Sequence, residues 1–234
     1  MPLRCVLFFL IVLGAPGAWA QESAIGDRAT SGDTFLLRDG REVRLANVCA
    51  ADEKAQSFLD AAVSGAPLVL KDAVRDRYGR IDAQVFQSNS GTSVGEDLVR
   101  EGKAYVCPAR ASDDLDALME AERRARDARR GLWSAEQDTR AKDAAVLRGR
   151  YGFVVGTVTG VKRVRNKVHL FLDGAPGFKM SLAARFLRPL KKRGLDPFLL
   201  KGERLRVRGW VSDDEGPTVL MADPHQMERL DFRP

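Results

Sequence analysis

Alternating apolar and polar positions dominate the first half of the chain. Phe35–Leu37 and Val43–Leu45 flank Asp39-Gly40, a dipeptide that strongly favours a hairpin turn. Further short strands are predicted at 68–70, 81–86 and 104–106, and helices at 53–62, at 95–101 and from Asp113 or Asp114 to Gly131. We expect the strands to meander into a small barrel with helices packed around it, and Trp133 to fold back and close its core.

From Tyr151 onward the pattern again predicts β structure. Strands are expected at 153–161, 168–172, 178–181, 205–211 and 218–221, with a helix at 182–194. Three strands, one helix and two strands is the order of an oligonucleotide/oligosaccharide-binding (OB) barrel. Residues 135–150 are charged, rich in alanine and poor in glycine and proline, which favours a helical connector. The predicted fold class is therefore mixed α+β and based on β-barrels, with domains at 21–134 and 151–234.

Residues 1–20 have the features of a secretory signal. Arg4 precedes an apolar stretch at 6–13 that is too short to span a bilayer, and Ala18-Trp19-Ala20 provides a small-x-small cleavage site. No later stretch approaches transmembrane length, so no membrane span is expected after cleavage. The sequence thus predicts an exported protein, periplasmic or secreted. An uncleaved N-terminal anchor is the alternative.

Two cysteines, Cys49 and Cys107, remain after removal of the signal. Cysteines of exported proteins commonly pair, because the compartment is oxidising. We therefore expect a Cys49–Cys107 disulfide, which would contribute roughly 3–4 kcal/mol by closing a long loop. Two buried, unpaired thiols are the alternative.

The charge is distributed unevenly along the chain. Residues 21–140 carry 18 lysines and arginines against 22 acidic residues, whereas residues 141–234 carry 19 against 10. The positive excess therefore lies in the C-terminal part, as in modules that bind polyanions. In that part Arg206 and Arg208 alternate along the strand predicted at 205–211, and we expect them to bind nucleic acid.

The chemistry-bearing residues of the first half occur in a recognisable order. Gly32-Asp33-Thr34 and Val43-Arg44-Leu45 come first, and Asp76-Arg77-Tyr78-Gly79-Arg80 follows. The helix around Ala121–Arg126 then ends at Arg130-Gly131-Leu132-Trp133. A carboxylate and two arginines presented in this way form a phosphate-handling constellation. In this order the fragments resemble the staphylococcal nuclease (thermonuclease) family.

The resemblance implies an OB-type barrel that hydrolyses phosphodiesters with a calcium ion, two arginines and a carboxylate. Asp33 matches the first metal carboxylate; the alternative is that it merely caps a turn at a strand entry. Arg44 matches the first phosphate-binding arginine, and Arg80 matches the second, which helps the leaving group. Asp52 lies at the position of the glutamate that assists the water, and Tyr78 matches a nucleotide-stacking tyrosine.

Cys49 departs from the family pattern, since it lies where the resemblance implies a second metal carboxylate. Calcium takes six to eight oxygen ligands, and sulfur is a poor substitute. The sequence therefore predicts an exported nuclease-like protein that acts on or binds nucleic acid (DNA or RNA), with hydrolysis weakened and calcium weak or absent. One alternative is an active nuclease in which Asp33, Asp52 and Glu53 hold a metal. The other is a non-catalytic envelope module that binds protein or glycan.

Overall fold

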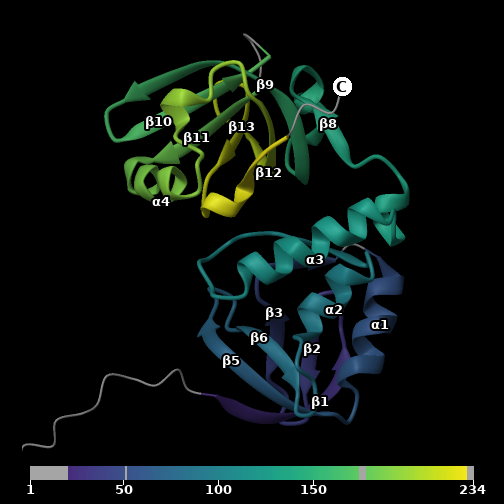
Figure 1. The fold of residues 1–234 in the computed structure, drawn as a ribbon. Helices are drawn as coiled ribbons and strands as arrows, with labels where there is room; N and C mark the ends of the chain where they lie inside the picture. Colours follow the sequence, from purple (N-terminus) through teal and green to yellow (C-terminus); the bar gives the residue numbers. More distant parts are fainter. Residues whose placement is uncertain (1–20, 51, 174–177, 231–234) are drawn as a thin grey trace, which may run out of the picture.

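The computed structural model describes residues 21–50, 52–173 and 178–230. The signal expected at residues 1–20 lies outside them. Two β-barrels follow one another along the chain, with a long helix between them (Figure 1). Within the described residues, no helix combines the length and apolar character needed to cross a membrane.

Five strands form the first barrel, at the bottom of Figure 1. They are β1 Glu22–Ala29, β2 Thr34–Leu37, β3 Glu42–Leu45, β5 Pro67–Arg75 and β6 Ile81–Gln87. The barrel closes in the order β1-β2-β3-β6-β5, with β3 and β6 parallel and the other neighbours antiparallel. The hairpin predicted around Asp39-Gly40 is confirmed, with Leu36 opposite Glu42. Phe35 and Val43 are fully buried in its core, as their alternation with polar residues requires.

Three helices and a two-stranded ladder surround this barrel. They are α1 Glu53–Val63, α2 Val94–Arg100 and α3 Leu115–Asp127, with β4 Val48–Ala50 paired to β7 Ala104–Val106. α1 buries Ala55, Leu59 and Val63, which share one helical face. α3 starts after Asp114, whose carboxylate accepts a hydrogen bond from Ser112 and not from the helix backbone. The predicted helices are confirmed, and α3 lies across the first barrel on the side that faces the second (Figure 1).

Two backbone segments cross in contact at Gly102 and Gly131. Both residues have positive φ angles, 62° and 52°. A Cβ on Gly102 would lie 2.2 Å from the carbonyl oxygen of Arg130, and one on Gly131 would lie 2.1 Å from the carbonyl oxygen of Gly102. The amide of Leu132 donates to that same Gly102 oxygen at 2.8 Å. The turn after α2 is thereby fastened to the segment after α3 at a point where only glycine fits.

The second barrel repeats the strand order of the first. Its strands are β9 Tyr151–Val164, β10 Lys167–Leu172, β11 Lys179–Ala183, β12 Arg204–Asp213 and β13 Pro217–Leu220. They close in the order β9-β10-β11-β13-β12, with β12 pairing back to β9 and with β11 parallel to β13. Between β11 and β12 the chain forms the 3₁₀ helices η3 Ala184–Phe186 and η4 Pro197–Leu199 and the helix α4 Leu187–Lys192. The predicted OB-like order is thus observed in both barrels.

The segment 135–150 differs from the expected helical connector. It contains a strand, β8 Asp138–Arg140, which pairs in parallel with β9, and a 3₁₀ helix, η2 Ala141–Leu147. Ala141 and Ala144 are buried against the second barrel, three residues apart, and a 3₁₀ helix places such residues on one line. The segment is therefore packed as part of the second barrel. After β13 the 3₁₀ helix η5 Pro224–Gln226 leads into β14 Met227–Arg229, which pairs with β12.

Trp133 lies between the barrels and does not close the core of the first, which corrects the prediction. It belongs to the 3₁₀ turn η1 Gly131–Ser134 and packs against Ala125 of α3 and Phe153 of β9. The Trp133 and Phe153 ring centroids are 5.4 Å apart. Tyr105 of β7 stacks on Tyr151 of β9 with centroids 5.2 Å apart. Aromatic contacts of this kind join the two barrels into one packed structure.

Candidate functional site

Asp33 and Arg44 lie side by side at the edge of the first barrel. Arg44 is on β3, where it pairs with Thr34 of β2 and Asp82 of β6, and Asp33 comes directly before β2. The Arg44 Nε is 3.5 Å from the Asp33 carboxylate. The other Asp33 oxygen accepts hydrogen bonds from the hydroxyls of Ser31 at 2.9 Å and Thr34 at 3.0 Å. Asp33 is thus held as an acceptor facing a cation, while about a third of the Arg44 side chain stays exposed.

Arg80 is fixed by the tight turn that precedes β6. Its Nε and Nη2 both donate to the Asp76 carboxylate at 2.8 Å. The other Asp76 oxygen accepts from the amides of Tyr78 and Arg80, and Gly79 supplies the positive φ of 83° that the turn needs. Tyr78 is exposed, with the guanidinium groups of Arg77 and Arg80 over its ring. The motif Asp76–Arg80 therefore presents one oriented arginine and one exposed aromatic ring.

Carboxylates further stabilise the charged form of the Arg80 guanidinium. The hydrogen bond that Arg80 donates to Asp76 raises the pKa of Arg80 above its ordinary value, burial opposes this, and the charges of Asp76, Glu42 and Asp33 raise it further. The charge of Asp33 thus acts on Arg80 as well as on its direct neighbour Arg44. An arriving phosphate would meet permanent cations whose own partners already orient them.

The predicted Cys49–Cys107 disulfide is confirmed. Cys49 lies on β4 opposite Tyr105 of β7, and Cys107 follows β7, so the ladder brings the two Cα atoms to 5.8 Å. The Arg44 Nη2 lies 3.8 Å from the sulfur of Cys49. The cystine therefore lies directly beside Arg44.

Asp52 is engaged as the N-cap of α1. Its carboxylate accepts a hydrogen bond from the Ala55 amide at 2.9 Å, which satisfies one of the free amides at the helix start. The loop before Asp33 approaches this helix start closely, because a Cβ on Gly32 would meet the side chain of Ala55 at 2.9 Å. Asp33, Cys49 and Asp52 thus come from neighbouring segments, but Asp52 already has a structural partner.

The comparison with protein families matches this part of the chain. Residues 43–135 match the family model described as staphylococcal nuclease homologue. The segment is a nuclease-like domain. The match spans Arg44, Cys49, Asp52, Tyr78 and Arg80, and it begins after Asp33. Comparison with curated proteins gives no match.

The nuclease-like domain does not offer a calcium site of the kind that its family implies. Among the described residues, no group of three or more His, Cys, Asp or Glu side chains is placed to hold a metal ion. The sulfur of Cys49 is bonded to Cys107, Asp52 caps α1, and Asp33 faces Arg44. Calcium takes six to eight oxygen ligands with several carboxylates among them. The donor set around Asp33 does not fit that requirement.

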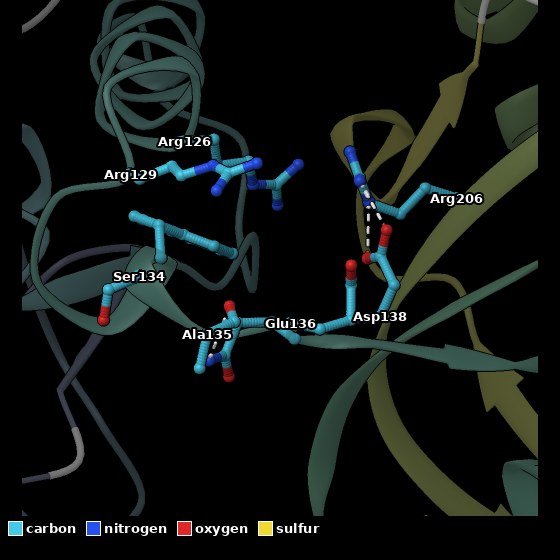
Figure 2. Close-up of a pocket in the computed structure, with 9 residues that line it drawn as sticks. Arg126, Arg129, Ser134, Ala135, Glu136, Asp138 and Arg206 are labelled. Atoms are coloured by element: carbon cyan, nitrogen blue, oxygen red, sulfur yellow. Dashed lines mark hydrogen bonds and ion pairs between the residues drawn. The ribbon is translucent and has the colours of Figure 1, made fainter.

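Arg208 is buried against α3 of the nuclease-like domain, and Arg206 is largely buried in ion pairs within the second barrel, so neither lies on an open surface, which corrects the prediction that they bind nucleic acid. Arg208 is 1% exposed, and its guanidinium group donates to Glu122 of α3 at 2.9 Å and to Glu228 of β14. Arg206 donates to Asp138 of β8 at 2.8 and 2.6 Å. Figure 2 shows this Arg206–Asp138 pair facing Arg126. The three side chains line a cavity of about 350 Å³.

Sequence reasoning missed the residues that the second barrel places beside Arg44. One cavity is lined by Arg44, the cystine, Tyr151 of β9, Trp210 of β12 and Leu220 of β13. The sequence contains a weak signal for it, since Trp210 continues the alternation that turns Arg206 and Arg208 outward from the barrel core. That signal could not show which surface the outward face meets.

Proposed function

We propose that the protein binds nucleic acid through the phosphate-binding arginines of its nuclease-like domain, with phosphodiester hydrolysis weakened or lost. The observation that carries this proposal is the cystine beside Arg44. A disulfide lies beside Arg44, at the sequence position where the resemblance implies a metal carboxylate, while Arg44 and Arg80 stay partly exposed beside their carboxylate partners. Binding a phosphate requires positive charge and N–H donors, whereas hydrolysis also requires an activated water and charge neutralisation at the leaving oxygen.

The two arginines come from adjacent segments of the first barrel. Arg44 lies on β3 and Arg80 directly precedes β6, and these two strands pair directly. Their side chains are 32% and 26% exposed, so each guanidinium group can reach solvent while Asp33 and Asp76 hold it in place. This pre-orientation reduces the entropy that binding would otherwise cost.

The second barrel adds long-range attraction. Its hairpin between β9 and β10 exposes Lys162, Arg163, Arg165 and Lys167, and residues 141–234 as a whole carry a large positive excess. Such a field draws polyanions toward the protein and makes their binding fall steeply with salt. This long-range attraction does not depend on the arginines of the nuclease-like domain.

Export to an oxidising compartment, periplasmic or extracellular, is part of this proposal. The predicted signal at residues 1–20 supports it, and so does the Cys49–Cys107 disulfide, since cytosolic reductants keep most thiols reduced. In that setting the ligand would be nucleic acid outside the cytoplasm.

The test combines cleavage and binding assays on single-stranded DNA and RNA, with calcium, with magnesium and with a chelator. We expect little cleavage in any condition and salt-sensitive binding in all of them. Arg44→Ala and Arg80→Ala should each weaken binding about tenfold, because each removes charge-assisted hydrogen bonds to phosphate. Arg123→Ala removes an exposed arginine of α3 and serves as the matched control, with less than a twofold effect expected.

Asp33→Ala separates the alternatives. Removing this carboxylate takes negative charge away from Arg44 but also removes the partner that orients it, and because these two effects oppose each other, binding should change little. Metal-stimulated cleavage that disappears in both Asp33→Ala and Arg80→Ala would instead establish an active nuclease and overturn the proposal. The protein could instead bind a glycan or another protein. If that binding were insensitive to salt and to substitution of both arginines, it would favour the envelope interaction module.

A further inference from the structure

A cavity of about 300 Å³ lies where the second barrel meets the candidate site. Arg44 and the Cys49–Cys107 cystine form the wall from the nuclease-like domain, and Tyr151, Trp210 and Leu220 form much of the opposite wall. Trp210 is 64% exposed and Leu220 is 55% exposed, although large apolar side chains of a barrel are normally covered. The cavity therefore combines one cation with an open aromatic and apolar surface.

The aromatic wall is rigid. Tyr151 and Trp210 are directly opposite each other on β9 and β12, and their rings meet edge to face with centroids 6.2 Å apart. Tyr151 in turn stacks on Tyr105, and its hydroxyl donates to the carbonyl of Val106 at 3.2 Å. A row of three rings thus runs from β7 to Trp210, whose exposed ring is backed on one side by fixed neighbours. A platform of this kind can receive another flat ring.

The polar side chains of the cavity already have partners within the protein. Ser212 donates to the carbonyl of Thr218, and the Gln226 amide accepts from two backbone amides and donates to the carbonyl of Arg208. Arg44 is the one charged residue among the described residues that line it. A sugar would need many hydrogen-bonding groups from these walls, whereas a ring that stacks beside a single phosphate would need an aromatic face and one cation.

We propose that this cavity binds one nucleotide unit of single-stranded nucleic acid, with its base stacked on Trp210 and its phosphate held by Arg44. The inference rests on the proposed function and adds the substrate class, because a base inside a duplex is already stacked and cannot reach Trp210. Stacking is tolerant of sequence, and the lining polar groups are satisfied, so little preference among the four bases is expected.

The experiment measures binding of the purified protein to a labelled single strand of mixed sequence, to its duplex and to an otherwise identical strand with abasic sites. We expect Trp210→Ala to weaken binding of the single strand about tenfold, as removal of one stacked base does. The same change should leave affinity for the abasic strand and for the duplex within twofold. Trp210→Phe, which keeps an aromatic face, should restore most of the lost affinity.

Phe198→Ala is the matched control, because Phe198 is a 49% exposed aromatic residue of the same barrel that does not line this cavity. Equal effects of Trp210→Ala and Phe198→Ala on single-strand binding would overturn the inference. Binding that still depended on Arg44 would, in that case, continue to support the proposed function. If no nucleic acid bound in a salt-sensitive way, this inference and the proposed function would both be overturned. Loss of oligosaccharide binding in Trp210→Ala, without loss of single-strand binding, would assign the cavity to a glycan.

Discussion

His225 is held between carboxylates from both barrels. Its Nδ1 lies 2.6 Å from Asp223, at the start of η5, and its Nε2 lies 3.0 Å from Asp116 of α3. Arg193, whose Nη1 is 2.8 Å from the ring, adds a like charge. Burial lowers the pKa of His225, but the hydrogen bonds to Asp223 and Asp116 outweigh it, and the pKa lies above its ordinary value of 6.5. The ring therefore links α3 to the second barrel through its contacts with Asp116 and Asp223.

The raised pKa of His225 predicts a dependence of stability on pH. The folded protein keeps this proton at a higher pH than the unfolded chain does, so the stabilisation is complete below about pH 6.5 and is lost as pH rises through the folded pKa. We expect the melting temperature to fall by about 1–3 °C from this source between pH 6 and pH 8, a small shift because Asp116 is largely exposed.

Thermal unfolding of His225→Gln at pH 6 and pH 8 tests this prediction, since the melting temperature of the variant should lack the fall that His225 causes. His169→Gln is the comparison. Burial, with Lys179 and Lys167 adding to it, lowers the pKa of His169, so its contribution has the opposite sign and is lost as pH falls. An unchanged pH slope in His225→Gln would contradict the assignment.

At the scale of elements, the short ladder of β4 and β7 depends on the cystine. Each strand has three residues, and the Cys49–Cys107 bond crosslinks them where the chain passes from the first barrel toward α1 and α3. The two cysteines are 58 residues apart in the sequence. A crosslink over a loop of that length restricts the unfolded chain strongly.

We expect Cys49→Ser with Cys107→Ser to lower the free energy of unfolding by about 4 kcal/mol, measured by urea denaturation. Reduction of the unmutated protein should produce the same loss, which serves as an internal control. A loss below about 1 kcal/mol would show that the ladder is held by its backbone bonds and by packing alone.

The elements that sequence alone could predict are those with local signals. The Asp39-Gly40 turn, the helical spacing of α1 and the alternation along β9 and β12 are all encoded within short windows. β1 was missed because Glu22–Ala29 has a weak alternation and is held by pairing with β2 and β5 on either side. Arg208 was misplaced because an arginine on an outward strand position gives the same pattern whether it meets solvent or Glu122. Those partners lie 86 residues apart and become visible only in the fold.

At the scale of the whole molecule, a buried ion network joins the barrels. Arg208 and Glu122 are each 1% exposed, and Glu228 and Arg126 extend the network. Glu122 also accepts from the Val106 amide at 2.7 Å, which ties the network to β7. Buried charges of this kind stabilise little by themselves, but removing one partner leaves another charge buried and unpaired.

Arg208→Ala should therefore lower the free energy of unfolding by about 3–5 kcal/mol and separate the unfolding of the two barrels. We expect one cooperative transition in the unmutated protein by calorimetry and two in the variant. Arg204→Ala removes an exposed arginine from the same face of β12 and should leave the single transition intact. A single, unshifted transition in Arg208→Ala would show that the aromatic contacts around Trp133 are enough to couple the barrels.

The crossing at Gly102 and Gly131 has a consequence for how the molecule tolerates change. The cavity beside Arg44 depends on the position of the second barrel relative to the first. That position is determined by the path that the chain takes after α3. With each glycine packed against the other's backbone, even a methyl group would push the two segments apart and displace Trp133 with everything that follows. Two positions without side chains, remote in sequence from Trp210, thus set the alignment of a composite ligand site. In a library of variants selected for binding, they would accept less variation than the residues of the site itself.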